Sequence, residues 1–469
     1  MTNDRVGGLP ELGSAQPATT AQSTMTSRAF IVVTRSYHRH GFEPLRRRAR
    51  TSRSSTAIIG RSRGDDMNGL LEWALTNAAL APSAPRWRAI WERAPELSPT
   101  ELAELDRALA HWPDGSRVAH AASLEDGPQP AHALVRRLEL EQGVVDAALV
   151  RAVLGSEHTA RVSSLALFSM ETQLDAIRVL ADAAPAALRE LQLAGDAIAD
   201  DASEILAASA LPIRVLTFEG ATTNRSVRAI AAGTGLPALD HLQYHDVQVD
   251  DEGVVALAAS ERMARLGTLR ISYAQVGRAG AEALASTRPS RLEHLDLGLN
   301  HVGHEGARAL VASSALTSLR SLHLSENRLG GPGVRALAEH CSLERLAELS
   351  LSYNQDSNRL LDPDSMVGTD GVRALAAARW LRTVERLELA GNAIGDEGMD
   401  ALCTSPNLGG LRELDVADNQ LGSRGVAALL ASSVIDQLKK LRIELNELGD
   451  DARDALFDAC EARGIALVA

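Results

Sequence analysis

The amino-acid sequence predicts an α/β solenoid of horseshoe form, in which strand, turn and helix units stack into one parallel concave sheet with convex helices. A helical N-terminal region precedes it. Three observations predict this fold: a leucine-rich phrase recurs at nearly constant spacing, its apolar positions alternate and then follow a helical period, and aromatic residues make up only 3% of the chain. A layered core of Leu, Val, Ile and Ala fits that composition.

The phrase LxxLxLxxNx(L/I/V)G defines the repeat. Five complete copies are present, at Leu292–Gly303, Leu319–Gly330, Val384–Gly395, Leu411–Gly422 and Leu438–Gly449. Six degenerate or interrupted copies begin at Val162, Leu188, Ile213, Leu239, Leu266 and Leu346. Successive copies begin 25 to 27 residues apart, except for one interval of 38 residues that carries an insertion. This spacing is typical of leucine-rich repeats, so we expect about eleven of them over residues 161–463.

Within each copy, the two inner leucines predict a short strand and the residue after it marks a turn. An asparagine at this position can donate to and accept from backbone groups that the turn leaves without partners. The last six copies place asparagines here, at Asn300, Asn327, Asn354, Asn392, Asn419 and Asn446. Earlier copies have Asp196, Ala221, Val247 and Ala274 instead. Stacked asparagines are therefore expected to form a structural ladder.

A helix is expected after each turn. Helical spacing of Val334 and Leu337 follows Gly330, and Pro332 suits a first helical turn. Residues able to cap a helix N-terminus stand at the equivalent place in later copies, at Thr369, Asp396, Ser423 and Asp450.

Both ends of a solenoid expose core residues and need caps. Residues 67–160 show helical spacing, a Ser98 to Glu101 capping box and four of the five tryptophans, which predicts a helical N-terminal region that covers one end. Tryptophans at helical spacing favour a core role. Residues 464–469 are expected to form a C-terminal capping strand.

Charge is unevenly distributed along the chain. The net charge is −13, but residues 1–66 hold eleven Arg and five acidic residues, a net +6, which leaves −19 for the remainder. We expect residues 1–66 to be a disordered basic tail or an overextended start; a transit peptide or a nucleic-acid-binding arm are alternatives. The acidic remainder disfavours nucleic-acid binding by the folded part.

The sequence carries no strong targeting or catalytic motif. No long apolar segment and no secretory signal order are found, so a cytoplasmic protein without membrane insertion is expected. Only two of 48 basic residues are lysines, a bias typical of a high-GC, bacterial genome. Phosphate-binding loops and motifs of hydrolases and metalloproteases are absent, and Cys341, Cys403 and Cys460 lie far apart. We expect no enzyme activity, no cofactor and no metal.

Two polar segments offer weaker signals. His301 and His304 form an HxxH pair without a third ligand in view, and solvated loop histidines are the simpler interpretation. The insertion at 355–366 holds Asp356, Asn358 and further acidic residues that could bind calcium, but its spacing differs from that of an EF-hand loop. A surface loop is therefore expected there.

Outward side chains of neighbouring strands should form columns across the concave face. The column between the inner leucines runs through Gln243, Arg270, Asp296, His323, Ser350, Glu388, Asp415 and Arg442. A flanking column contains His241, His294, Glu348, Arg386 and Glu413, and Tyr273, Leu299, Glu326, Tyr353 and Asp418 are assigned to the other flank. Exposed aromatic and apolar side chains on a rigid sheet anchor interfaces. We expect the partner-binding residues to be Arg270, Tyr273, His294, Leu299, His323 and Tyr353.

The repeats resemble those of ribonuclease-inhibitor-like leucine-rich-repeat proteins, and residues 116–138 look similar to a companion domain that precedes repeats in some bacterial proteins. The resemblance implies a full helix on the convex side of each repeat and a monomeric scaffold or adaptor that binds another protein. The family also includes Ran GTPase-activating proteins, so regulation of a small GTPase is the alternative. Phosphate release from candidate GTPases would separate the two functions.

Overall fold

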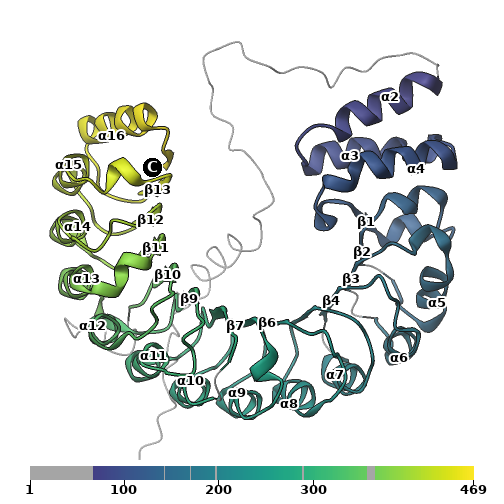
Figure 1. The fold of residues 1–469 in the computed structure, drawn as a ribbon, viewed down its shortest axis with the longest axis horizontal. Coiled ribbons are helices and arrows are strands. Elements are labelled where there is room, and N and C mark those ends of the chain that lie inside the picture. Colours follow the sequence, from purple (N-terminus) through teal and green to yellow (C-terminus); the bar gives the residue numbers. More distant parts are fainter. Residues whose placement is uncertain (1–66, 142, 169–170, 196–197, 288–289, 356–364) are drawn as a thin grey trace, which may run out of the picture. The chain divides into compact units, whose positions relative to one another are not determined.

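The computed structural model describes residues 67–141, 143–168, 171–195, 198–287, 290–355 and 365–469. The predicted basic tail, Asp196 of the expected turn series and residues 356–364 of the insertion lie outside the described residues. Residues 65–469 form one compact unit. Within it, strands lie along the inner side of a curved array and helices along the outer side (Figure 1).

One parallel sheet runs through the described part of the chain. Its fourteen strands follow chain order, and every neighbouring pair is parallel. The strands are β1 (Val118–His120), β2 (Arg137–Leu140), β3 (Ser164–Leu167), β4 (Glu190–Ala194), β5 (Val215–Glu219), β6 (His241–His245), β7 (Thr268–Ser272), β8 (His294–Asp296), β9 (Ser321–His323), β10 (Glu348–Ser350), β11 (Arg386–Glu388), β12 (Glu413–Asp415), β13 (Lys440–Arg442) and β14 (Ala466–Val468).

The eleven predicted strands are β3 to β13, and their parallel order is confirmed. β14, which pairs with β13, is the strand expected within residues 464–469, whereas β1 and β2, which precede β3, were not predicted. Residues 67–160 are thus not wholly helical: β1 and β2 extend the sheet. Short 3₁₀ segments, Ala121–Leu124 and Pro130–Leu134, connect these two strands in place of a full helix.

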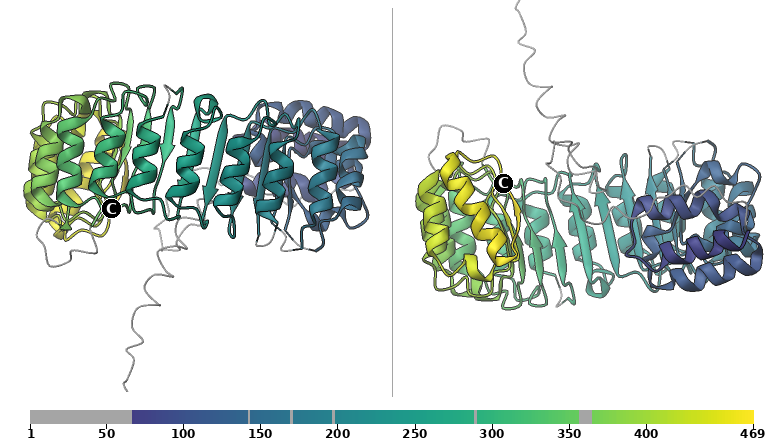
Figure 2. Two further views of the ribbon diagram at one scale, coloured as in Figure 1. Left: turned by 90° about the horizontal axis from the view of Figure 1, so that it is seen from below. Right: turned by 90° about the horizontal axis from the view of Figure 1, so that it is seen from above.

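A helix follows each strand from β2 to β13. The helices that cover the outer side are α5 (Ala147–Gly155), α6 (Leu174–Ala183), α7 (Ala199–Ala207), α8 (Asn224–Ala232), α9 (Asp251–Ala258), α10 (Arg278–Ala285), α11 (Gly303–Val311), α12 (Gly330–His340), α13 (Gly368–Ala377), α14 (Gly395–Cys403), α15 (Ser423–Ala431) and α16 (Asp450–Arg463). They stand side by side across the array (Figure 2). Leucines at the two inward strand positions, such as Leu322 and Leu324, are fully buried between sheet and helices.

Three helices form the N-terminal end of the described chain: α2 (Met67–Ala78), α3 (Ala84–Arg93) and α4 (Pro99–Ala108). The capping box predicted for α4 is confirmed, since Glu101 N–H donates to Ser98 Oγ and Ser98 N–H donates to Glu101. Trp112 is buried, and its indole N–H donates to the Ala78 carbonyl. This tryptophan therefore has a core role.

The predicted helix caps are wrong in position. Asp396 lies inside α14, and its Oδ1 instead accepts from the backbone N–H groups of Gly422 (2.7 Å) and Gly425 (2.9 Å) at the start of the next helix. Asp251 does the same for the start of α10. A carboxylate thus caps the helix of the following repeat, where it satisfies N–H groups at the positive end of the helix dipole. A Cβ on Gly425 would lie 2.7 Å from Asp396 Oδ1, which explains the glycine.

The asparagines after the strands join neighbouring repeats. Asn392 is fully buried; its Nδ2 donates to the carbonyl of Leu351 in the preceding repeat (2.9 Å) and its Oδ1 accepts from the Asn354 N–H (3.0 Å). The other members each likewise donate to a carbonyl of the preceding repeat and accept from one of its N–H groups: Asn300, Asn327, Asn354, Asn419 and Asn446. These contacts are those of the expected ladder.

In repeats without an asparagine at the ladder position, backbone groups make the hydrogen bonds between neighbouring turns. Val247 N–H donates to the Tyr273 carbonyl (3.2 Å), and Ala274 N–H donates to the Leu299 carbonyl (3.3 Å). Both residues are buried. The inter-repeat contact therefore persists in this part of the array, but without a side-chain amide that reaches back to the preceding strand.

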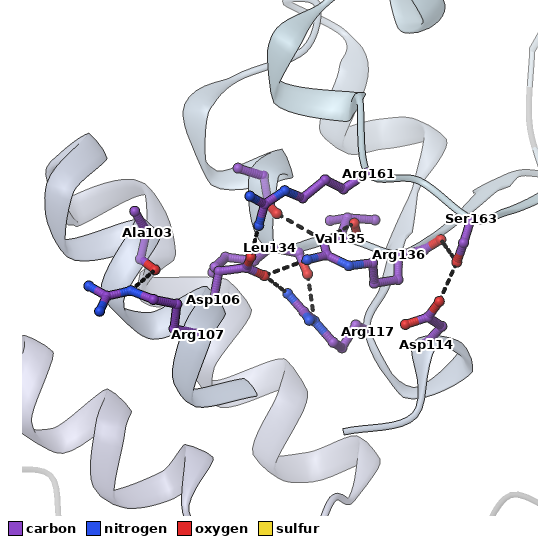
Figure 3. Close-up of polar contacts among 11 residues, drawn as sticks. Ala103, Asp106, Arg107, Asp114, Arg117, Leu134, Val135, Arg136, Arg161 and Ser163 are labelled. Atoms are coloured by element: carbon purple, nitrogen blue, oxygen red, sulfur yellow. Dashed lines mark hydrogen bonds and ion pairs between the residues drawn. The ribbon is translucent and has the colours of Figure 1, made fainter. Parts of the chain in front are cut away.

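An ion-pair cluster centred on the buried Asp106 joins α4 to the loops before the first three strands (Figure 3). Asp106 accepts from Arg117, Arg136 and Arg161. Arg117 is almost completely buried, and burial lowers the pKa of its guanidinium. Its Nε donates to the Leu134 carbonyl at 2.7 Å. One carboxylate thus compensates cations from three successive segments.

Replacement of Asn392 by Ala should lower the free energy of unfolding by about 1 to 3 kcal/mol, because buried backbone groups on two repeats would lose their partners. Asn446→Ala is the matched control: Asn446 makes equivalent hydrogen bonds but is only half-buried, so water can replace them. Urea unfolding of both variants measures the difference. An equal loss in both would contradict the role given to burial.

Replacement of Asp106 by Ala should cost about 3 to 5 kcal/mol, because it leaves the buried Arg117 without a counter-charge. Hydrogen exchange at the amides of β1 to β3, together with urea unfolding, measures this loss. Glu282→Ala, which removes an exposed pair with Arg278 (2.6 Å), should cost no more than about 0.5 kcal/mol. Equal effects from the two substitutions would show that burial of the cluster adds nothing.

Candidate functional site

Strand register generates the columns of the concave face. The central column passes through consecutive register partners from Gln243 on β6 to Arg442 on β13, as the sequence predicts. The first flanking column, from His241 to Glu413, also follows the strand register. Thr268 lies between His241 and His294, and Ser321 lies between His294 and Glu348. Both columns therefore present polar side chains on fixed backbone positions.

A depression of about 330 Å³ lies on this face over strands β6 to β11. It brings together three of the predicted binding residues, Arg270, His294 and His323. The remaining lining is formed by His241, Gln243, Thr268, Leu269, Leu295, Asp296, Ser321, Glu348 and Arg386. Arg270 Nε lies 3.1 Å from Asp296 Oδ2, so its lining contains an ion pair.

Tyr273, Leu299 and Tyr353 do not belong to a strand column, which corrects the sequence assignment. The strands end before these residues, and each lies in the turn with a left-handed backbone, at φ of 52°, 57° and 55°. Each directly precedes the residue at the ladder position, where the chain must leave the sheet. Because side chains in a strand alternate, a strand continued to this residue would bury its side chain. The left-handed turn directs the chain away instead.

These turn residues form a continuous row along one edge of the concave face, which we call the rim row. Backbone bonds join Tyr273 N–H to the Gly298 carbonyl (3.0 Å), Leu299 N–H to Ser325 (2.9 Å) and Glu326 N–H to Ser352 (2.9 Å). Its members are Asp246, Tyr273, Leu299, Glu326, Tyr353, Gly391, Asp418 and Leu445. Tyr273 is 41% exposed, Tyr353 37% and Leu445 75%.

Neighbouring residues hold the two tyrosine rings in place. The Tyr273 ring stacks on the His245 ring at 6.4 Å between centroids. The Tyr353 ring lies over Gly391 of the next repeat, where an added Cβ would come within 2.1 Å of the ring. Gly391 therefore permits this placement, and both rings pack against residues of a neighbouring repeat.

Two carboxylates of this region lie in a costly environment. Burial raises the pKa of Glu326, which lies in the rim row between Leu299 and Tyr353. Burial also raises the pKa of Asp415 on β12, despite hydrogen bonding from Ala417 N–H and the nearby Arg442. Both carboxyl groups therefore resist ionisation, and a cationic group of a partner would stabilise their charged forms.

The described residues show few signs of catalytic chemistry. Burial raises the pKa of the Cys341 and Cys403 thiols to about 11, which disfavours reactive thiolates. His301 and His304 do not belong to a metal-ligand group of three among the described residues. Asp356, Asn358, Asp362 and Asp364, considered for calcium, lie outside those residues.

Comparisons with known proteins agree on the repeat. The family model described as Leucine Rich repeat matches residues 290–311, 315–338, 381–403 and 411–430. Together with the parallel sheet and outer helices, this match defines the class of the fold as a leucine-rich-repeat solenoid. No curated protein matches the chain significantly.

Solved structures with a similar fold show low identity. An internalin from Listeria monocytogenes shares 16% identity, with a TM-score of 0.41 over 72% of this chain and 87% of its own. A Bacteroides fragilis protein shares 16%, with a TM-score of 0.36 over 52% and 68%. A chain of the Rad7 and Elc1 complex of yeast shares 13%, with a TM-score of 0.46 over 95% and 98%.

Within the described ranges, none of the helices combines the length and the apolar character needed to cross a membrane.

Replacement of Glu326 by Gln should raise the melting temperature at pH 7. The folded-state pKa of Glu326 is raised, so the stability that its protonated form provides is present at low pH and is lost as pH rises through that pKa. The advantage of the variant should therefore vanish near about pH 4, where the wild-type carboxyl is protonated. Melting curves from pH 4 to 8 test this, with Glu447→Gln at an exposed turn as the control. A variant that is less stable at every pH would refute the buried-carboxylate account.

Proposed function

We propose that the chain is a protein-interaction scaffold or adaptor that binds a partner protein through the rim row and the adjoining concave face. The observation that carries this proposal is the row of partly exposed Tyr273, Leu299 and Tyr353 on consecutive or nearby turns of a rigid sheet. Large apolar and aromatic side chains that are already ordered lose little conformational entropy on binding.

The depression beside the rim row provides polar groups at the edge of the proposed interface. Arg270, His294 and His323 offer hydrogen bonds next to the apolar row, an arrangement in which polar groups surround a dry contact. Glu326 and Asp415 would gain from a cationic partner group, since burial disfavours their charged forms. The proposed partner therefore presents an apolar segment flanked by Arg or Lys.

We also propose the ribonuclease-inhibitor-like subtype, on the basis of helices that run for eight to fourteen residues behind β2 to β13. In this proposal the protein is a monomer that binds its partner without catalysing a reaction. The partner can be identified experimentally through its contact with the rim row.

A photo-crosslinking residue in place of Tyr353 should capture one partner from cell extract after illumination. The same residue in place of Arg335 on α12 should not capture that protein, since α12 lies on the outer side of the array (Figure 1). The measurement is mass spectrometry of the crosslinked band. Capture from α12 and not from the rim row would contradict the proposal.

With that partner purified, replacement of Tyr273 and Tyr353 together by Ala should weaken affinity by at least about 2 kcal/mol, roughly thirtyfold, because central anchors dominate interface energy. Arg308→Ala on α11 should leave affinity unchanged. Binding titrations measure the affinities, and melting curves show whether each variant is folded. Folded tyrosine variants with undiminished affinity would remove the rim row from the interface.

A further inference from the structure

Three possible metal ligands converge at the N-terminal end of the sheet, away from the rim row. His120 on β1 and Glu139 on β2 are register partners, and Glu141 follows two residues later. His120 Nδ1 lies 3.5 Å from Glu139 Oε2 and 3.5 Å from Glu141 Oε1. All three ligand atoms lie within 4.8 Å of one another. Strand pairing therefore brings one imidazole and two carboxylates to one place.

We propose that His120, Glu139 and Glu141 bind one divalent transition-metal ion of the zinc class. Around tetrahedral zinc, bonds of about 2.0 to 2.2 Å separate neighbouring ligand atoms by about 3.3 to 3.5 Å. Both imidazole-to-carboxylate distances agree with that separation. Imidazole with carboxylates is a donor set that such ions accept, and three protein ligands leave a further position open to solvent.

Arg137 provides the outer contact that a ligating carboxylate needs. Its Nε lies 2.6 Å from Glu139 Oε1, the oxygen that does not face His120. Further hydrogen bonds to Ser164 Oγ (3.2 Å) and Gln192 Oε1 (2.9 Å) hold the guanidinium in place. The carboxylate is thereby oriented with Oε2 directed toward the proposed ion, as outer-shell donors do in metal sites.

Charge and access favour an aqueous cation. Two carboxylates with a single arginine leave a negative charge at the group, which a divalent ion would neutralise. The side chains of His120 and Glu141 are 57% and 46% exposed, so an ion reaches them without a conformational change. Among the described residues, no other group of three His, Cys, Asp or Glu side chains meets these distances.

The test uses the full-length chain without an affinity tag, titrated with Zn²⁺ alone by calorimetry and with Co²⁺ alone by visible spectroscopy. One ion per chain is expected, with d–d absorption that marks a site of low coordination number. His120→Ala and Glu139→Gln should each weaken binding at least tenfold. His340→Ala, which removes an exposed histidine on α12, should not change it.

Two further readouts separate ligation from folding. The ion should raise the melting temperature of the wild type and of His340→Ala but not that of His120→Ala, because only a bound ligand stabilises the folded state. Binding should weaken as pH falls, since protons compete for the imidazole. Absence of saturable binding near one equivalent, or full binding by folded His120→Ala and Glu139→Gln variants, would overturn the proposal. Neither result bears on the rim row, which lies in the turns after β6 to β13.

Discussion

Hydrogen bonds between the turns of consecutive repeats are the constraint on which this structure depends. Each strand is short, and the chain must bend away directly after it, which leaves backbone N–H and carbonyl groups buried and in need of partners. Asn392 meets this need for two repeats at once, with a donor to Leu351 and an acceptor for Asn354. Where alanine or valine stands in its place, backbone groups of the next turn take over. The stack is continuous because no repeat can satisfy its own turn.

The same constraint shapes the proposed binding surface. A left-handed residue must precede each ladder position, and this geometry carries its side chain out of the sheet and onto the rim. Tyrosine at two such positions costs conformational energy that glycine, as at Gly391, avoids. The partly buried Glu326, whose pKa is raised by desolvation, adds a second cost on the same row. Surface residues that are present although they reduce the stability of the fold are the ones expected to serve binding.

The features of the structure that recur from repeat to repeat could be predicted from the sequence. The strands β3 to β13, their parallel order and the six ladder asparagines follow from leucine spacing alone. Sequence reasoning missed β1, because Val118–His120 lacks the inner leucines and Arg137 follows after a shorter interval than in the repeats. It also missed β2, although Leu138 and Leu140 alternate there and Val135 lies 27 residues before Val162. Asp396 was assigned to its own helix, since a contact with Gly422 of the next repeat leaves no local signal. Strict alternation from Leu322 and Leu324 would have placed Glu326, and with it Tyr273 and Tyr353, outside the strand columns.

The central claim is that a partner covers the rim row and not the outer helices. Hydroxyl-radical footprinting of the chain, alone and with its crosslink-identified partner, measures this directly from the oxidation of individual side chains. The account predicts that oxidation of Tyr273 and Tyr353 falls on complex formation, while Phe457, 59% exposed on α16, is oxidised equally in both states. Protection of Phe457 with unchanged oxidation of both tyrosines would contradict it.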